Sequence, residues 1–278
     1  MSDSDRQNSA QKARYTRLVF LGDSNADNGN VHRLTHGTHP APSSLYWQGR
    51  YSDGKVWADH LADLASPTPT INLAYGCATI DNEIVSGTVA VPGGQRVEVP
   101  SVADQANELE SLVKHLNPAD LVLVQVGSND LNSLIDSGSL YQRKCAFTPQ
   151  QLAERLGHIV RRICVQLGAR NVLVLNVRPR EDYPGVIALN DPHLLEKTRQ
   201  DTALFNATIS NEITALQTAL GANYCVSLFD TYTAQKDIAL IADPVSGKQV
   251  SDPKLFVDGC HLGSRAQKEV FKRVLESI

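Results

Sequence analysis

Hydrophobic runs rich in valine, isoleucine and leucine alternate along this chain with longer stretches of helical periodicity. The runs are continuous, without a clean two-residue alternation, which is typical of strands buried on both faces. The predicted strands are 17–22, 70–75, 120–126, 171–177 and 223–228. The predicted helices are 54–65, 101–116, 149–168, 191–220 and 262–276. This alternation predicts a parallel sheet with helices on both sides.

No internal repeat and no long linker divides the chain, so its 278 residues are expected to form one main domain. The first 16 residues are polar and lack the apolar core of a signal peptide. We therefore expect a disordered tail over 1–16, a single domain over 17–278 and a cytoplasmic location. No window approaches the ~18 apolar residues that a membrane-spanning helix needs.

Composition narrows the possible partners. The chain is 42% hydrophobic and 20% charged, with a net charge of −4 and no basic run, which argues against nucleic acid or an anionic membrane as the main partner. Its five cysteines are odd in number and scattered, and no Cys-x-x-Cys pair occurs. That pattern is a poor disulfide framework and fits a reducing setting.

Four short polar clusters give the strongest indication of chemistry. Three follow apolar runs and the fourth precedes the last predicted helix: Gly22-Asp23-Ser24, Gly76-Cys77, Gly127-Ser128-Asn129-Asp130 and Asp258-Gly259-Cys260-His261. In an open parallel sheet, sites form beyond the carboxyl ends of the strands, so distant clusters can meet there. Together they supply a serine, an acid, a histidine and hydrogen-bond donors, the set that a serine nucleophile requires.

Each cluster also has a purely structural interpretation when taken singly. Ser24 can be a helix N-cap, and so can Asp258, with His261 exposed beside it. Asn129 after a glycine can be an ordinary turn residue. However, Asp258 and His261 stand three residues apart, close enough for the carboxylate to hold the imidazole. The joint order of the clusters at strand ends favours a catalytic site.

Other functional motifs are absent from the sequence. It has no Gly-x-Ser-x-Gly elbow, no dinucleotide or phosphate-binding glycine loop and no His-Glu-x-x-His. His32, His36 and His39 have helical spacing that can suit zinc, but Gly37 and Pro40 interrupt the helix. We therefore predict no metal and no cofactor.

The clusters lie in segments that resemble the GDSL, or SGNH, esterase and lipase family. Phe20–Asn30 is similar to its first block and Gly49–Trp57 to the segment that follows in plant and fungal members. Asn72–Thr79 resembles the second block, Val126–Asp130 the third and Asp258–His261 the last. These blocks occur in the family's order and cover the chain from residue 17 to its end.

The resemblance implies a three-layer, flavodoxin-like α/β/α sandwich around a five-stranded parallel sheet, and hydrolysis of carboxylic esters. Ser24 would be the nucleophile, His261 the base and Asp258 the acid that orients it. The oxyanion would be held by the Ser24 backbone N–H, the Asn129 side-chain amide and a backbone N–H from the second block.

The second block departs from the family's pattern at the position of that backbone donor. Cys77 stands where the resemblance calls for glycine, and Gly76 precedes it. A backbone N–H survives this replacement, but the added Cβ can narrow the acyl pocket or demand different backbone angles. Four further polar residues belong to the matching blocks and are expected to support them: Asp23, Asp27, Asn30 and Asp130.

These observations predict a serine esterase acting on a small or medium ester, with no stable membrane insertion and an oligomeric state left open. An acyltransferase with the same three residues is the alternative, because its first half-reaction is identical. A binding protein that retains the fold without catalysis is the alternative from a different class. Specificity is expected to lie in the loops 31–50, 80–100, 132–148 and 178–192.

Overall fold

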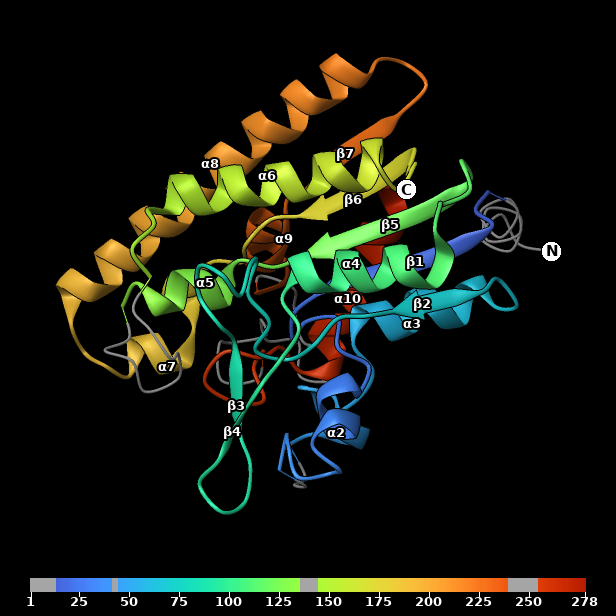
Figure 1. The fold of residues 1–278 in the computed structure, drawn as a ribbon. Coiled ribbons are helices and arrows are strands. Elements are labelled where there is room, and N and C mark those ends of the chain that lie inside the picture. The colour runs from blue at the N-terminus through green and yellow to red at the C-terminus, as the bar shows by residue number, and fades with distance from the viewer. Residues whose placement is uncertain (1–13, 42–44, 136–144, 240–254) are drawn as a thin grey trace.

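The computed structural model describes residues 14–41, 45–135, 145–239 and 255–278. Its centre is a five-stranded, all-parallel sheet in the order β2-β1-β5-β6-β7. The strands are β1 (Arg17–Gly22), β2 (Thr70–Asn72), β5 (Asp120–Gln125), β6 (Asn171–Leu175) and β7 (Cys225–Phe229). The chain adds β2 on one side of β1 and the remaining strands on the other, so the strand order reverses beside β1 (Figure 1).

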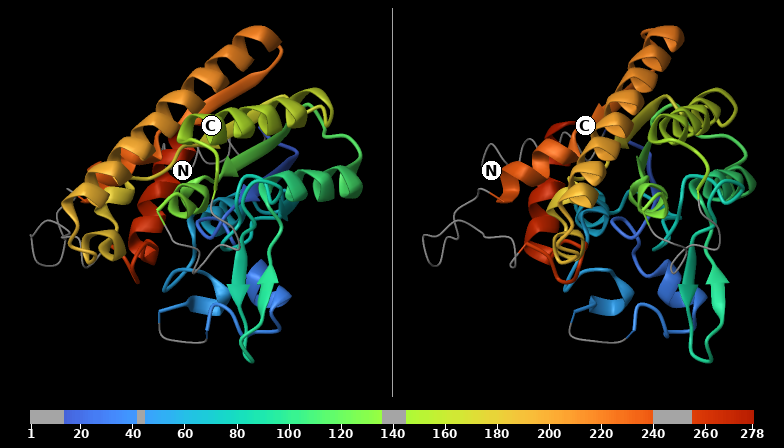
Figure 2. Two further views of the ribbon diagram at one scale, coloured as in Figure 1. Left: turned by 60° about the vertical axis from the view of Figure 1, so that its left-hand side comes forward. Right: turned by 90° about the vertical axis from the view of Figure 1, so that its left-hand side faces the viewer.

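Helices cover both faces of the sheet, as Figures 1 and 2 show. One face carries α4 (Val102–Val113), α6 (Pro149–Val165) and α8 (Pro192–Leu220). The other carries α3 (Trp57–Ala65), α9 (Thr231–Ala239) and α10 (Ser264–Glu276). Each face of the sheet has its own hydrophobic core, because successive side chains of β1 point to opposite faces. Val19 and Leu21 pack under α4, α6 and α8, and Leu18 and Phe20 pack under α3, α9 and α10. The predicted three-layer sandwich is confirmed.

Shorter elements fill segments that the sequence predicted as loops or turns. They are α2 (Asn30–Leu34), η1 (Trp47–Gly49), β3 (Thr88–Ala90), β4 (Arg96–Glu98), α5 (Ser128–Ser133), η2 (Arg180–Asp182) and α7 (Pro184–Ile187). The antiparallel β3–β4 hairpin projects away from the sheet, as does α2 (Figure 1). These pieces are too short for periodicity to identify them, and they surround the carboxyl edge of the sheet.

The beginning of the described chain is attached to the fold. The backbone N–H of Thr16 donates to the carbonyl of Ala119 at 2.9 Å, and Tyr15 packs against the core beneath α3 and α10. Ordered contacts therefore begin before residue 17, and residues 1–13 of the expected tail lie outside the described residues.

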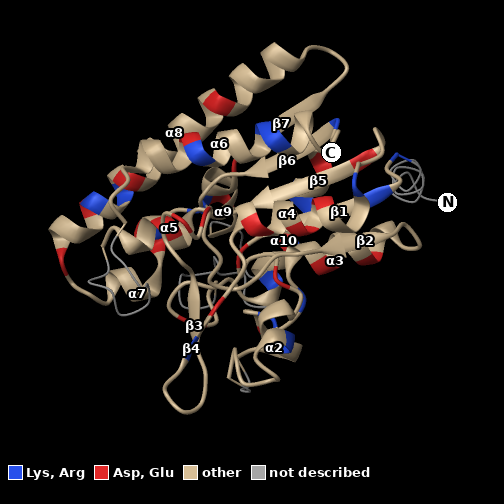
Figure 3. Cartoon of the chain, viewed as in Figure 1, with Lys and Arg blue, Asp and Glu red and all other residues tan. Residues whose placement is uncertain are grey.

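Charge is mixed over the described surface. In Figure 3, basic and acidic residues are interspersed along α8 and the other elements, in keeping with the small net charge of −4. Within the described ranges, no helix is both long enough and apolar enough to cross a membrane.

Candidate active site

The segment Gly22–Asp27, which we call the nucleophile turn, leaves the sheet at the end of β1. Gly22 has φ 151°, and a Cβ there would lie 2.2 Å from the carbonyl oxygen of Gln125, so the position requires glycine. The buried Gln105 side chain accepts from the Gly22 N–H at 2.7 Å and donates to its carbonyl at 2.9 Å. The chain thus turns off the strand and presents Ser24, 7% exposed, at the carboxyl edge of the sheet.

The segment Leu255–Gly263, which we call the base loop, brings His261 to this serine. The Nε2 atom of His261 lies 2.9 Å from the Oγ atom of Ser24, across 237 residues of chain. Its Nδ1 atom lies 2.6 Å from Oδ2 of Asp258. The other carboxylate oxygen accepts from the N–H of Cys260 at 2.8 Å and of His261 at 2.7 Å, which fixes the acid within its own turn. Serine, imidazole and carboxylate are therefore in line.

The electrostatics of this line favour an imidazole that attracts a proton. Burial raises the pKa of Asp258, but the hydrogen bond and charge of His261 more than offset this and leave that pKa below its usual value. Burial alone lowers the pKa of His261, yet the adjacent Cys260 and Asp258 reverse the shift and leave it raised. A histidine held in this way is well suited to take a proton from a hydroxyl group.

Two tyrosines from the segment after α2 complete the surroundings of the imidazole. The hydroxyl of Tyr46 donates to Oδ2 of Asp258 at 2.8 Å. The ring of Tyr51 is buried and lies 5.0 Å, centroid to centroid, from the ring of His261. A Cβ on Gly76 would lie 2.1 Å from the Tyr51 ring, so this tyrosine also packs directly on the second block.

The segment after β6 holds the base loop from the opposite side. The buried Arg178 guanidinium donates to the carbonyl of Cys260 at 2.9 Å and to the Gln235 side chain at 2.8 Å. The N–H of Gly185 donates to the carbonyl of Gly259, also at 2.9 Å. Tyr46, Arg178 and Gly185 could not be predicted from the sequence, because each contacts a loop far away in the chain.

The second block forms a tight turn beside the nucleophile turn. The N–H of Gly76 donates to Oδ2 of Asp27 at 2.8 Å, so the oxyanion role expected of Gly76 does not fit and Cys77 is the remaining candidate in this block. Cys77 has φ 64°, the left-handed conformation that favours glycine. The amide of Asn129 donates to the carbonyl of Ala78 at 2.8 Å, which ties the third block to this turn.

The carboxylate of Asp27 organises the first block. It accepts from the backbone N–H groups of Gly29 at 2.7 Å, Asn30 at 2.5 Å and Val31 at 3.3 Å, in addition to Gly76. The carboxylate therefore accepts hydrogen bonds from the N–H groups at the start of α2 and also fixes the second block.

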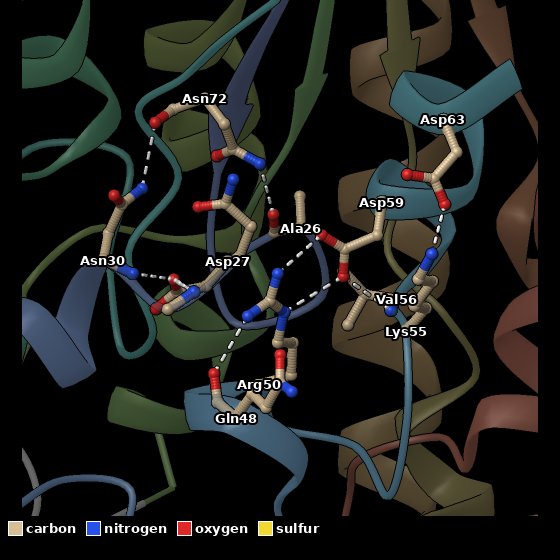
Figure 4. A network of polar contacts seen from close by, with 12 residues as sticks. Ala26, Asp27, Asn30, Gln48, Arg50, Lys55, Val56, Asp59, Asp63 and Asn72 are labelled. Carbon is tan, nitrogen blue, oxygen red and sulfur yellow. Dashed lines mark hydrogen bonds and ion pairs between the residues drawn. The ribbon is translucent and has the colours of Figure 1, made fainter. Parts of the chain in front are cut away.

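Asparagines extend this network between blocks (Figure 4). The amide of Asn30 donates to the carbonyls of Asn72 at 3.0 Å and Ala74 at 2.8 Å, and the amide of Asn72 donates to that of Ala26 at 2.8 Å. Nearby, Arg50 forms an ion pair of 3.0 Å with Asp59 in the first turn of α3. The segment Gly49–Trp57, which resembles plant and fungal members of the family, is thereby joined to α3.

The remaining motif acids are buried and hydrogen-bonded. Both oxygens of Asp130 accept from the N–H of Ile80, at 3.0 and 3.2 Å, and Asp23 accepts from the backbone N–H and side chain of Asn25. Burial raises the pKa of Asp23, of Asp27 and of Asp130, the last to about 7. These acids connect and stiffen the turns that surround the serine.

The three spaced histidines do not form a metal cluster among the described residues. Helix α2 ends at Leu34, and His36 has φ 51°. The three histidines therefore lack the helical spacing that a zinc site on one helix face would need. His39 lies beside the ring of Tyr51 instead.

The polar blocks gather at the carboxyl edge of the three-layer fold, where sites form in open parallel sheets. Residues 18–274 match the model of the family described as GDSL-like Lipase/Acylhydrolase. The chain belongs to this family, which confirms the resemblance found in the sequence.

Two relatives extend this result. A thermolabile hemolysin of Vibrio parahaemolyticus is 24% identical over 249 residues, covering 89% of this chain and 53% of the hemolysin. A GDSL esterase/lipase of Arabidopsis thaliana is 24% identical and covers 81% of this chain and 71% of that protein. The chain therefore spans about half the length of the hemolysin and most of the plant protein.

Solved structures share the fold. Phospholipase A1 from Streptomyces albidoflavus NA297 superposes with a TM-score of 0.51 at 18% identity, covering 95% of this chain and 99% of that chain. A member of the lipolytic G-D-S-L family from Veillonella parvula DSM 2008 gives a TM-score of 0.50 at 11% identity, with 94% and 96% covered. Likeness at such identities is evidence for the fold alone.

Proposed function

We propose that this chain is a serine hydrolase that cleaves carboxylic esters through an acyl-enzyme on Ser24. The observation that carries the proposal is the line of contacts from the Ser24 hydroxyl through both nitrogens of His261 to the Asp258 carboxylate. A hydroxyl group is a weak nucleophile until a base takes its proton, and this line provides the base and its orienting acid.

In the first half-reaction, Oγ of Ser24 attacks the ester carbonyl while Nε2 of His261 takes its proton. The protonated imidazole then gives this proton to the departing alcohol, and the acyl group stays on the serine. Asp258 remains ionised throughout and stabilises the imidazolium that forms. In the second half-reaction, the same base activates water, which releases the carboxylic acid.

The developing oxyanion would be held by the backbone N–H groups of Ser24 and Cys77 and by the amide of Asn129. Preorganised donors of this kind act mainly in the transition state, where the negative charge appears. The hydrogen bonds of Asp27 to Gly76 and of Asn129 to Ala78 keep the second and third blocks in place beside the serine.

The substrates we propose are esters of small or medium acyl chains. Support comes from Cys77, whose side chain stands at the family's glycine position, and from the Tyr51 ring, which packs on Gly76 and lies 5.0 Å from the ring of His261. The Arabidopsis relative is named an esterase/lipase, which makes longer lipid esters the alternative substrate class.

The test combines covalent labelling with turnover. We expect a fluorophosphonate to label the wild type and Ser111→Ala, an exposed-helix control, but not Ser24→Ala. Aryl esters of increasing acyl length should be hydrolysed best at short or medium length, and Ser24→Ala and His261→Ala should lose turnover to a similar degree, since the two residues act as a unit. Labelling of folded Ser24→Ala would remove the nucleophile assignment.

Acyl transfer is the second candidate. A phosphatidylcholine-sterol acyltransferase of Aeromonas hydrophila is 30% identical over 122 residues, covering 42% of this chain and 33% of that protein. Because the acyl-enzyme is common to both reactions, adding an acceptor alcohol and measuring the ratio of new ester to free acid decides between them. If labelling and turnover both fail in the folded wild type, the chain is a binding protein on this fold.

A further inference from the structure

A thiol, an imidazole and a carboxylate meet within four residues of the base loop. One ligand atom from each of Asp258, Cys260 and His261 lies within 4.8 Å of the other two. Across the described ranges, no other group of three or more histidine, cysteine or acidic side chains is gathered as closely. All three residues are partly exposed, and the thiol of Cys260 forms or breaks no bond in the proposed hydrolysis.

The spacing of the two softer ligands suits a tetrahedral ion. The Sγ atom of Cys260 lies 3.4 Å from Nδ1 of His261 and 3.8 Å from Nε2. With bonds of about 2.3 Å to sulfur and about 2.0 Å to nitrogen, tetrahedral zinc holds such ligand atoms about 3.5 Å apart. The thiol and the imidazole therefore already stand at the required separation. The direction of the thiol must still change, because its nearly equal distances to the two nitrogens place Sγ over the ring face and a bound ion lies in the ring plane.

The carboxylate needs a small movement to become the third ligand. Its Oδ2 atom is 2.6 Å from Nδ1 of His261, because a proton lies between them. A metal in place of that proton would require about 3.3 Å between oxygen and nitrogen with bonds of about 2.0 Å. Thiolate and imidazole together favour Zn²⁺ over Mg²⁺ or Ca²⁺, and the thiol releases its proton when the ion binds.

We propose that Asp258, Cys260 and His261 form an inhibitory zinc site. Zinc on Nδ1 forces the remaining proton onto Nε2, where it faces Ser24 and prevents the ring from accepting the serine's proton. The base is thereby lost, so the ion and the ester reaction exclude each other. The inhibition rests on the proposed function, whereas the binding does not.

Binding is measured first, without reference to activity. Competition between the full chain and a chromogenic chelator should give one zinc ion per wild-type chain, and the same for Ser24→Ala. Cys260→Ser should bind at least ten-fold more weakly. Cys225→Ser is the matched control, because Cys225 is an exposed thiol at the start of β7, and it should bind as the wild type does. Cd²⁺ should produce a thiolate charge-transfer absorption band in the wild type and not in Cys260→Ser.

Turnover is measured next, with each variant compared to its own zinc-free rate. Zinc should inhibit the wild type reversibly, with recovery on adding a chelator, and Cys260→Ser should need at least ten-fold more zinc. Equal zinc affinity in the wild type and Cys260→Ser, or turnover that is insensitive to bound zinc, would overturn the proposal. Tight, Cys260-dependent binding by a chain that hydrolyses no ester would support the metal site and remove the proposed function instead.

Discussion

The nucleophile turn and the base loop meet at one hydrogen bond, but they are attached to the fold in different ways. The turn continues a central strand and is held by Gln105, by the carbonyl of Gln125 and by the Asp27 network, all of them buried. The ends of the base loop are buried in the core through Leu255, Phe256 and Leu262. The turn between them, which carries Asp258 and His261, is anchored by contacts from separate loops, through Tyr46 and Arg178. Substitutions in the nucleophile turn and its neighbouring blocks should therefore lower the stability of the fold. Substitutions around the base loop should mainly disturb the alignment of His261 with Ser24.

After the loss of turnover expected for Ser24→Ala and His261→Ala, the next largest effect should be on the rate of Asn129→Ala. Asn129→Ala should lower kcat by about 10²–10³ with a much smaller change in KM, because one oxyanion donor is removed. Steady-state kinetics on a short aryl ester measures both constants. A change confined to KM would make Asn129 a substrate-positioning residue.

The next effect should be on stability. Asp27→Ala leaves the N–H groups of Gly29, Asn30, Val31 and Gly76 without their carboxylate partner. We expect the free energy of unfolding to fall by about 3 kcal/mol, since each buried unpaired group costs about 1–3 kcal/mol and some will find water. Urea denaturation measures it. A loss below about 1 kcal/mol would contradict the coupling of this side of the site to stability.

A substitution that acts on the base loop should change the rate more than the stability. Tyr46→Phe removes the hydroxyl donor to Asp258 and leaves the ring in place. We expect kcat to fall about five-fold, as one modest hydrogen bond is worth about 1 kcal/mol, while the urea midpoint barely moves. Loss of stability as large as that of Asp27→Ala would show that both sides are attached alike.

The smallest effect should come from Cys77→Gly. The residue adopts φ 64°, and relieving a left-handed conformation for a non-glycine residue should gain about 1 kcal/mol. The stability cost of glycine in regular structure does not apply, because Cys77 lies in a turn. The variant keeps its backbone N–H and should remain active with a broader acyl range. An inactive but folded variant would mean that the Cys77 side chain takes part in the chemistry.

The sequence predicted the parts of the molecule that depend on local pattern. Continuous apolar runs located all five strands of the parallel sheet, and polar residues just beyond them indicated Ser24 and Asn129. The three-residue spacing of Asp258 and His261 also predicted their contact, because it depends on a single turn. The roles of these residues remain predictions until variants are measured.

What the sequence could not predict depends on long-range packing. Tyr46 reaches Asp258 across 212 residues, Gln105 reaches Gly22 across 83, and Arg178 reaches Cys260 across 82. Tyrosine, glutamine and arginine are common in loops and helices, so their types alone indicate no partner. For the same reason the sequence could not show that the N–H of Gly76 donates to Asp27. This hydrogen bond can be recognised only when the first and second blocks are seen side by side.

The contact between Gly185 and Gly259 limits which substitutions this protein can accept during evolution. A Cβ on Gly185 would lie 3.1 Å from the carbonyl oxygen of Gly259, and a Cβ on Gly259 would lie 3.4 Å from Cα of Gly185. Neither backbone can retreat freely, because the N–H of one donates to the carbonyl of the other. The contact is tight for a side chain at Gly185 and ordinary for one at Gly259, so a saturation library built at both positions should return more functional substitutions of Gly259 than of Gly185.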